Sequence, residues 1–344
     1  MDNTKVKKQS RRIRVDFERA PFWVRFKSKF LSFYFWKRVL FLIFKLVLLV
    51  GVSYVILYPY ITKIFNSFKV KEDFTNVTVI LFSKSPTLEQ YKYIITENHY
   101  FQTLFNTFIV SLSVALLQTL VCALIAYGLA KFKFKGNGAV FIFVIITMMI
   151  PQDVIKTAMS TYFTFFGDKT IVGNVLQFFG VMQHGFENSL VPLYLLSITG
   201  LGFKNGLFIF MLRQFFTGVP DELEESAYVD GSSTFRTFFS IILPLSVPML
   251  ITVFIFAFAW QWTDNFYVNM FLTDQSSDAF RMLAQTARNV PVSLEPANSF
   301  AAKDVYMNAV RGTSCILLII PLIIVYLFVQ NKIVQGIERS GIVG

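Results

Sequence analysis

Residues 220–244 read PDELEESAYVDGSSTFRTFFSIILP, a stretch that begins with acidic residues and ends in an apolar segment. Pro220 suits the first turn of a helix, and Asp221 is an acidic residue at the positive end of that helix. Gly231 marks its end, because glycine readily adopts the left-handed conformation that follows a helix C-terminus. The pattern predicts a short acidic helix followed by a sharp turn.

A second helix is predicted after the turn. Ser232 or Ser233 can cap it, and it continues into apolar residues from 240 onward. On the first helix, Leu223 and Ala227 are four residues apart and share a face, where the small Ala227 lets a partner surface approach closely. We interpret the acidic helix–turn–helix as a docking element for a soluble partner. The alternative is a solvated loop whose glycine only ends a helix.

Apolar segments lie on both sides of this stretch. The chain is 54% hydrophobic, 17% aromatic and only 15% charged, whereas soluble domains carry roughly a quarter charged residues. Several segments are long enough to cross a hydrocarbon core of about 30 Å. The sequence therefore predicts an all-α integral membrane protein with six transmembrane helices. The predicted spans are 41–65, 103–130, 138–165 (interrupted by Pro151), 190–216, 240–263 and 310–330.

Positive charge is unevenly distributed along the chain. The net charge is +11, and 12 of the lysines and arginines precede residue 39. A second basic cluster, 131–135, follows the second predicted span. Such clusters remain in the cytoplasm and attract anionic lipid headgroups, so we do not expect nucleic-acid binding. The predicted organisation is a basic cytoplasmic tail, 1–40, and a six-helix transmembrane domain, 41–344, with a cytoplasmic loop, 217–239, and both termini inside.

The spacing of residues 225–244 resembles the EAA loop of ABC importer permeases. That signature is Glu-Ala-Ala, three residues, Gly, nine residues, then Ile-x-Leu-Pro. Glu225 and Ala227, Gly231, and the IILP of 241–244 meet every spacing, and Ser226 departs by standing where the family has alanine. The wider context, over about residues 46–344, resembles the sugar-permease branch typified by the maltose system. The matching pieces are 212–216, 230–231, 243–245 and 261–264.

The resemblance implies a type I ABC importer permease that moves a carbohydrate inward across a bacterial cell membrane. It implies three kinds of partner: a second permease chain in a heterodimer, a dimeric ATPase, and an extracellular solute-binding protein. ATP and Mg²⁺ would be bound by the ATPase, with no cofactor on this chain. The residues that would couple to the ATPase are Glu224, Glu225, Ala227, Asp230 and Gly231.

A substrate path is predicted from polar and aromatic residues near the ends of spans. Trp260, Trp262, Asp264 and Asn265 close the fifth predicted span, and Asp153 follows Pro151 in the third. Aromatic rings beside carboxylates and amides suit sugars, and an acid within a membrane segment is a functional candidate. Tryptophan is also an ordinary residue of membrane interfaces, and Asp153 could lie in the outer interface, so both interpretations stay open.

Several chemistries are not supported by the sequence. It contains no phosphate-binding Gly-x-x-x-x-Gly-Lys-Ser/Thr loop and no Gly-x-Ser-x-Gly elbow, and His99 and His184 are too far apart to suggest a metal cluster. We therefore do not expect an enzyme. The remaining alternatives are an ABC permease for an amino acid or peptide, a channel or ion-driven transporter, and a membrane-embedded enzyme. Arg213 either pairs with an acidic residue of the loop or extends its charge to the inner surface.

Overall fold

A computed structural model describes residues 23, 33–165, 186, 188–202, 204–274 and 280–341. The predicted insertion at 167–188 lies almost entirely outside these residues, as do His184 and most of the basic tail. The described part of the chain is helical and contains no strand. Its longer helices are α2 (Phe33–Asn66), α3 (Glu89–Glu97), α4 (Tyr100–Lys131), α5 (Asn137–Met149), α6 (Gln152–Thr164), α9 (Val191–Ile198), α10 (Asn205–Thr217), α11 (Glu222–Val229), α14 (Val247–Trp262) and α17 (Lys303–Gly341).

Contacts divide the chain into two units, Met1–Thr62 and Lys63–Gly344. Most of α2 belongs to the first unit. None of the side chains of α2 is buried, as expected for an apolar helix whose surroundings are lipid or another chain. The second unit contains all the remaining helices.

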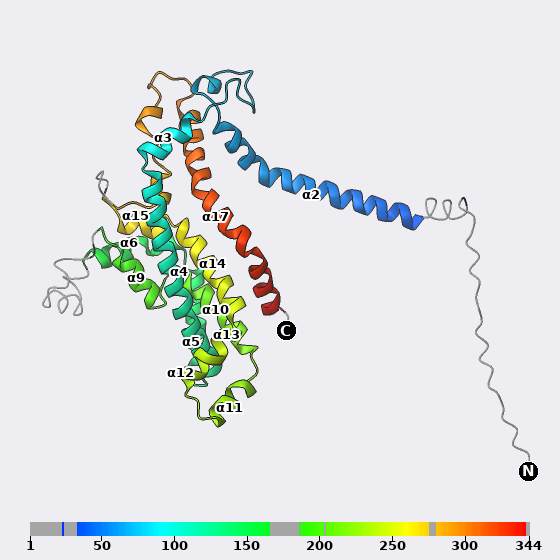
Figure 1. Cartoon of the computed structure of the whole chain (residues 1–344), viewed down its shortest axis with the longest axis vertical. Helices are drawn as coiled ribbons and strands as arrows, with labels where there is room; N and C mark the ends of the chain where they lie inside the picture. Colours follow the sequence, from blue (N-terminus) through cyan, green and yellow to red (C-terminus); the bar gives the residue numbers. More distant parts are fainter. Residues whose placement is uncertain are drawn as a thin grey trace, which may run out of the picture. The chain divides into compact units, whose positions relative to one another are not determined.

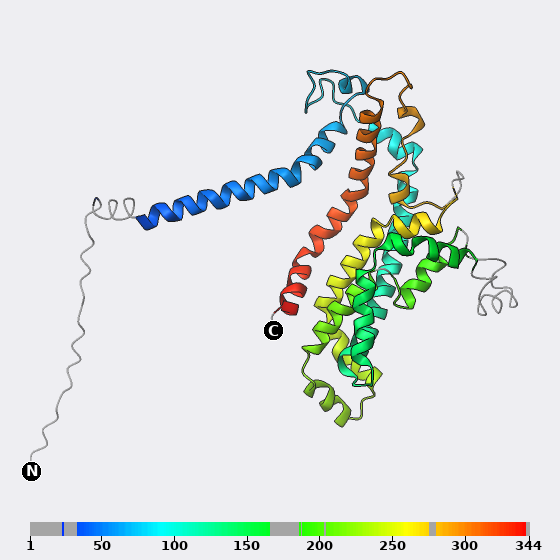
Figure 2. The same ribbon diagram turned by 180° about the vertical axis from the view of Figure 1, so that it is seen from behind.

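The second unit is organised around α4. This helix packs against both α10 and α14, and α17 packs on α14 (Figure 1; Figure 2 gives the view from behind). Ala115, Ala123 and Ala126 of α4 are fully buried, and their small side chains admit Phe208 of α10 and Val253 of α14 into the same core. Close packing over small residues is the usual way in which helices associate within a membrane.

Helices cover the six predicted segments, but three of these segments are interrupted. Three helices, α2, α4 and 303–331 of α17, are long and apolar enough to cross a membrane, and two bent pairs raise the number to five if each pair is one span. One pair is α5 and α6, bent by 100° at Pro151. The fourth predicted span, 190–216, is covered by α9 and α10 together. They are separated at Gly200, whose φ of 74° is incompatible with a continuing helix.

The second bent pair joins the predicted coupling loop to α14. It consists of α12 (Thr234–Thr237), a π-helical turn (Phe238–Ile242) and α13 (Leu243–Leu245), followed by α14 at an angle of 80°. Pro244 and Pro248 explain the break, because neither can donate the backbone hydrogen bond that an α-helix needs at its position.

The two ends of the second unit differ in character. At one end, which we call the α3 end, Gln90 donates to the carbonyl oxygens of Asn66 and Lys69 and accepts a hydrogen bond from Thr313 of α17. This ties the segment after α2 to the start of α17. At the opposite end, which we call the α11 end, α11 projects beyond the bundle (Figures 1 and 2).

Candidate functional site

The turn after α11 has the conformation that the sequence predicts. Gly231 has a φ of 80°. Its N–H donates to the carbonyl oxygen of Tyr228 at 3.0 Å, and the N–H of Ser232 donates to the carbonyl oxygen of Ala227 at 2.9 Å. These two hydrogen bonds form a Schellman motif, which satisfies carbonyls left unpaired at the helix end. Ser233 then caps α12 by accepting from the N–H of Arg236. The turn is therefore fixed by its own backbone.

The structure separates the five predicted coupling residues into two groups. Glu224 and Ala227 are buried against the bundle, whereas Glu225, Asp230 and Gly231 are exposed. The burial of Ala227 is against this chain, so its small side chain lets α11 approach the bundle. The exposed surface of α11 carries the acidic side chains of Glu225 and Asp230. The apolar side chains of Leu223, Tyr228 and Val229 are exposed beside them.

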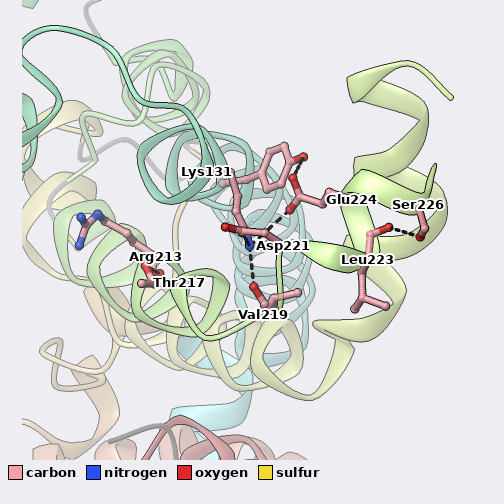
Figure 3. A network of polar contacts seen from close by, with 9 residues as sticks. Lys131, Arg213, Thr217, Val219, Asp221, Leu223, Glu224 and Ser226 are labelled. Atoms are coloured by element: carbon pink, nitrogen blue, oxygen red, sulfur yellow. Dashed lines mark hydrogen bonds and ion pairs between the residues drawn. The ribbon is translucent and has the colours of Figure 1, made fainter. Parts of the chain in front are cut away.

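The loop is held to the bundle by Lys131, the last residue of α4. Its Nζ donates to Asp221 Oδ1 and to the carbonyl of Val219, both at 2.6 Å, and lies 3.6 Å from Glu224 Oε1. Figure 3 shows the Lys131 ammonium among these three acceptors. Tyr127, one turn earlier in α4, donates from its hydroxyl to Glu224 Oε2 at 3.3 Å. The Lys131 ammonium holds the pKa of Asp221 below its ordinary value.

Sequence reasoning did not find Lys131 as the anchor of this loop. It offered Arg213 as a partner for the acidic residues, and within the described residues that pairing is wrong. The guanidinium of Arg213 lies 3.9 Å from the centre of the Phe141 ring, and its Nε donates to the carbonyl of Leu129 at 3.4 Å. The available signal was a basic residue at the end of one span and an acidic loop predicted on the same side.

A cavity of about 340 Å³ lies where α14 ends and α15 (Phe266–Phe271) begins. We call it the α14–α15 cavity. Trp260, Asp264 and Asn265 from the predicted substrate path all line it. The lining is completed by side chains of mostly polar or aromatic character: Gln118, Gln152, Lys204, Ala257, Gln261, Thr263, Phe266 and Tyr267.

The aromatic wall of the α14–α15 cavity is held from behind. The Trp260 ring stacks on Phe208 with centroids 5.6 Å apart, and Lys204 Nζ lies 4.8 Å from the Trp260 ring centre. Asp264 has a structural task, because its carboxylate accepts from the N–H groups of Phe266, Tyr267 and Val268 at the start of α15. Burial nevertheless raises the pKa of Asp264, against the lowering effect of these hydrogen bonds.

The other two predicted path residues lie elsewhere. Trp262 is buried, and its Nε1 donates to the carbonyl of Leu318 of α17 at 2.9 Å. Asp153 is exposed in the first turn of α6. Neither lines the α14–α15 cavity, so the structure brings together three of the five residues. Within the described part of the chain, no group of three or more His, Cys, Asp or Glu could hold a metal ion.

Comparisons with known proteins cover both the loop and the cavity. Residues 119–339 match the family model described as the binding-protein-dependent transport system inner membrane component. The trehalose/maltose transport system permease protein MalG of Thermococcus litoralis is 27% identical over 87% of this chain and 97% of its own length. The maltodextrin transport system permease protein MdxG of Bacillus subtilis is 25% identical over 85% of this chain and 92% of its own length.

A solved structure has a similar fold. It is a bacterial ABC transporter involved in the import of the acidic polysaccharide alginate, with a TM-score of 0.60 and 20% identity, covering 86% of this chain and 97% of that one. The family model spans well over half of the chain and describes membrane components of transport systems, not enzymes. The chain belongs to the family of binding-protein-dependent transport system inner membrane components.

Proposed function

We propose that this chain is the permease subunit of an ATP-driven importer for a carbohydrate, coupled to a separate ATPase through residues 217–239. The observation that carries the proposal is the loop at the α11 end. Its backbone is fixed by the Schellman turn at Gly231, and its inner face is anchored by Lys131. A force applied to the exposed face therefore reaches α4 through Lys131 and α14 through α12 and α13.

The carbohydrate assignment is supported by the α14–α15 cavity and by the relatives. Trp260 offers an aromatic face for the C–H surface of a sugar ring, and Gln118, Gln152, Gln261 and Asn265 offer amide donors and acceptors for hydroxyl groups. Several relatives are named for trehalose, maltose, maltodextrin or arabino-oligosaccharides. An amino acid or peptide would need charged partners for its termini. The charged groups in the lining are Lys204, whose ammonium lies over the Trp260 ring, and Asp264, whose carboxylate already accepts hydrogen bonds from three N–H groups of α15.

The proposed assembly has four kinds of component. A second, different permease chain completes the path, a dimeric ATPase binds ATP and Mg²⁺, and an extracellular solute-binding protein delivers the sugar. The α11 end faces the cytoplasm of a bacterial cell, with both termini on that side. The positive charge of the sequence 1–40 favours attraction to anionic lipid headgroups.

Purification of the assembled importer tests the function. The tagged chain is isolated in mild detergent from its own cells, its partners are identified, and the complex is placed in vesicles with the solute-binding protein. We expect ATP-dependent uptake of one of trehalose, maltotriose and an arabino-oligosaccharide, and none of a tripeptide. Uptake of the tripeptide alone would refute the carbohydrate assignment. Uptake by a homodimer of this chain with its ATPase would refute the heterodimer.

A further inference from the structure

Gln118 places an amide in the middle of α4, far from either end of this long apolar helix. It precedes Lys131, the last residue of α4, by 13 residues, which is about 20 Å along the helix axis. In a hydrocarbon core of about 30 Å, an amide at this distance from the α11 end lies well inside the membrane. Polar side chains are costly there and commonly belong to the path of a substrate.

The amide of Gln118 is buried without a partner among the described residues. The residue is 7% exposed, and its side chain forms no hydrogen bond with any residue that the structure describes. Buried amides are almost always paired, because an unpaired one forfeits the hydrogen bonds that water would supply. Gln118 lines the α14–α15 cavity, whose volume of about 340 Å³ gives a partner room to enter. That partner is either water or a ligand of the cavity.

The other amides of the lining are placed differently. Gln261 Nε2 lies 3.5 Å from Asp264 Oδ2, and Asn265 Oδ1 accepts a hydrogen bond from within α15. Gln152 is half-buried at the first residue of α6, where water can pair with it. Gln118 therefore combines deep burial with an amide that no described residue satisfies.

Gly202 closes one side of the Gln118 amide. A Cβ at position 202 would lie 3.1 Å from Gln118 Nε2, which is closer than ordinary van der Waals contact. The glycine therefore lets the amide rest directly on the backbone that precedes α10, and no further space remains on that side. The amide is held in place from behind, and the cavity is its open side.

An amide that faces a cavity in this way favours a hydroxyl group as its partner. The side-chain carbonyl oxygen accepts hydrogen bonds and the NH₂ group donates them, and a hydroxyl can pair with either atom. An ammonium group only donates, and a carboxylate only accepts. Trp260 of α14 lines the same cavity. A sugar ring stacked on the Trp260 face carries its hydroxyl groups around the rim, where the side chains beside Trp260 can reach them.

We propose that Gln118 is a specificity-determining residue of this transporter, whose amide binds a ring hydroxyl of the transported carbohydrate while the ring lies against Trp260. The inference rests on the proposed function and assigns one residue of the α14–α15 cavity to the recognition of one substrate group. Water offers the same hydrogen bonds, so the experiment has to separate water from the sugar.

The test uses the complete importer in vesicles with whichever sugar of the panel is taken up best, together with its singly deoxygenated analogues. Gln118→Met keeps the length of the side chain and removes the amide. The uptake efficiency, kcat/KM, of the parent sugar should fall about two- to tenfold, as for the loss of one hydrogen bond. The efficiency for one deoxy analogue, which lacks the hydroxyl that Gln118 binds, should not change.

The solute-binding protein is the same for wild type and variant, so a change in the ratio of parent to analogue between them comes from this chain. Gln118→Asn withdraws the amide by one methylene and keeps an amide at this position. It should lower the ratio for the same analogue, and its result decides if Gln118→Met does not assemble. Gln330→Met is the matched control, because the Gln330 amide donates to the carbonyl of Leu327 in its own helix and lies outside the cavity lining. It should change neither the efficiency nor the ratio.

Two results overturn the inference and are distinguishable. An equal fall for the parent sugar and every analogue, or no fall at all, would mean that Gln118 binds only water, and the proposed function would stand. Failure of wild type to take up any sugar would overturn the proposed function and this role of Gln118 with it.

Discussion

Replacing Lys131 with methionine should detach the loop at the α11 end from the bundle. Methionine keeps much of the aliphatic length of lysine but removes the ammonium group. The change removes the cation from Asp221 Oδ1, from the carbonyl of Val219 and from Glu224 Oε1. Among the hydrogen bonds and ion pairs of the described residues, the hydrogen bond from the Tyr127 hydroxyl to Glu224 Oε2 would remain.

The magnitude follows from burial. The side chains of Lys131 and Glu224 are 6% and 9% exposed, so their pair is largely shielded from water. Removing one partner of a buried pair costs about 3–5 kcal/mol, and we take about 3 kcal/mol because Tyr127 still donates to Glu224. The side chain of Asp221 is 73% exposed, so solvent screens its pair and it adds nothing to this figure.

Hydrogen exchange measures this loss directly. In the purified importer at neutral pH, about 3 kcal/mol corresponds to amide exchange in α11 that is about 100- to 200-fold faster. Glu224→Gln in the Lys131→Met background removes the buried charge and should restore most of the protection. Lys135→Met is the control, because Lys135 is exposed and belongs to neither of the two ion pairs described.

The reasoning would be refuted by wild-type exchange of α11 in the Lys131→Met protein. It would also be refuted if the double variant were as unprotected as the single one, because the buried charge of Glu224 would then not be the cause.

Four further predictions concern other parts of the molecule. Glu225→Lys reverses a charge on the exposed face, so ATP-driven uptake should be lost while α11 keeps its protection; normal uptake at normal abundance would contradict the coupling role. Gly231→Ala should destabilise the turn by about 1–2 kcal/mol, because its φ of 80° is left-handed, and unaltered exchange at the turn would argue against this. Because burial raises the pKa of Asp264, this carboxyl stays protonated to higher pH in the folded protein than in the unfolded one. The stability that the protonated carboxyl contributes is therefore lost as pH rises through the folded pKa. The thermal midpoint of Asp264→Asn should fall less than that of wild type between about pH 4 and about pH 7. Parallel curves for the two proteins would contradict a raised pKa at Asp264. In intact cells an impermeant thiol reagent should label Ser85→Cys and not Val229→Cys, and the reverse would overturn the proposed topology.

The parts of the fold that depend on neighbouring residues were predictable from the sequence. The left-handed turn at Gly231 and the cap at Ser233 are confirmed, because both depend on chemistry within a few residues. The break at Pro151 is likewise a property of one proline. The family resemblance is also confirmed. It was predictable because a sequence motif consists of residue types at fixed spacing along the chain.

The parts that depend on which helix faces which were not predictable. Lys131 and Glu224 are far apart in the sequence, and nothing local indicated that one would anchor the other. Trp260 and Trp262 are two residues apart, so they point about 200° apart around α14. One consequently lines the α14–α15 cavity and the other turns to α17, and the sequence did not distinguish them.

The π-helical turn at Phe238–Ile242 makes the segment between α11 and α14 sensitive to insertions and deletions. A π-helical turn contains one residue more than an α-helical turn, and each residue in a helix corresponds to about 100° of rotation. Deleting one residue there would rotate α12, and α11 beyond it, by about that angle relative to α14. The outward face of α11 would then point along a different direction. The number of residues between Gly231 and Ile241, which is nine, thus sets the orientation of α11 relative to α14. An insertion or deletion among them would reorient every exposed side chain of α11 at once.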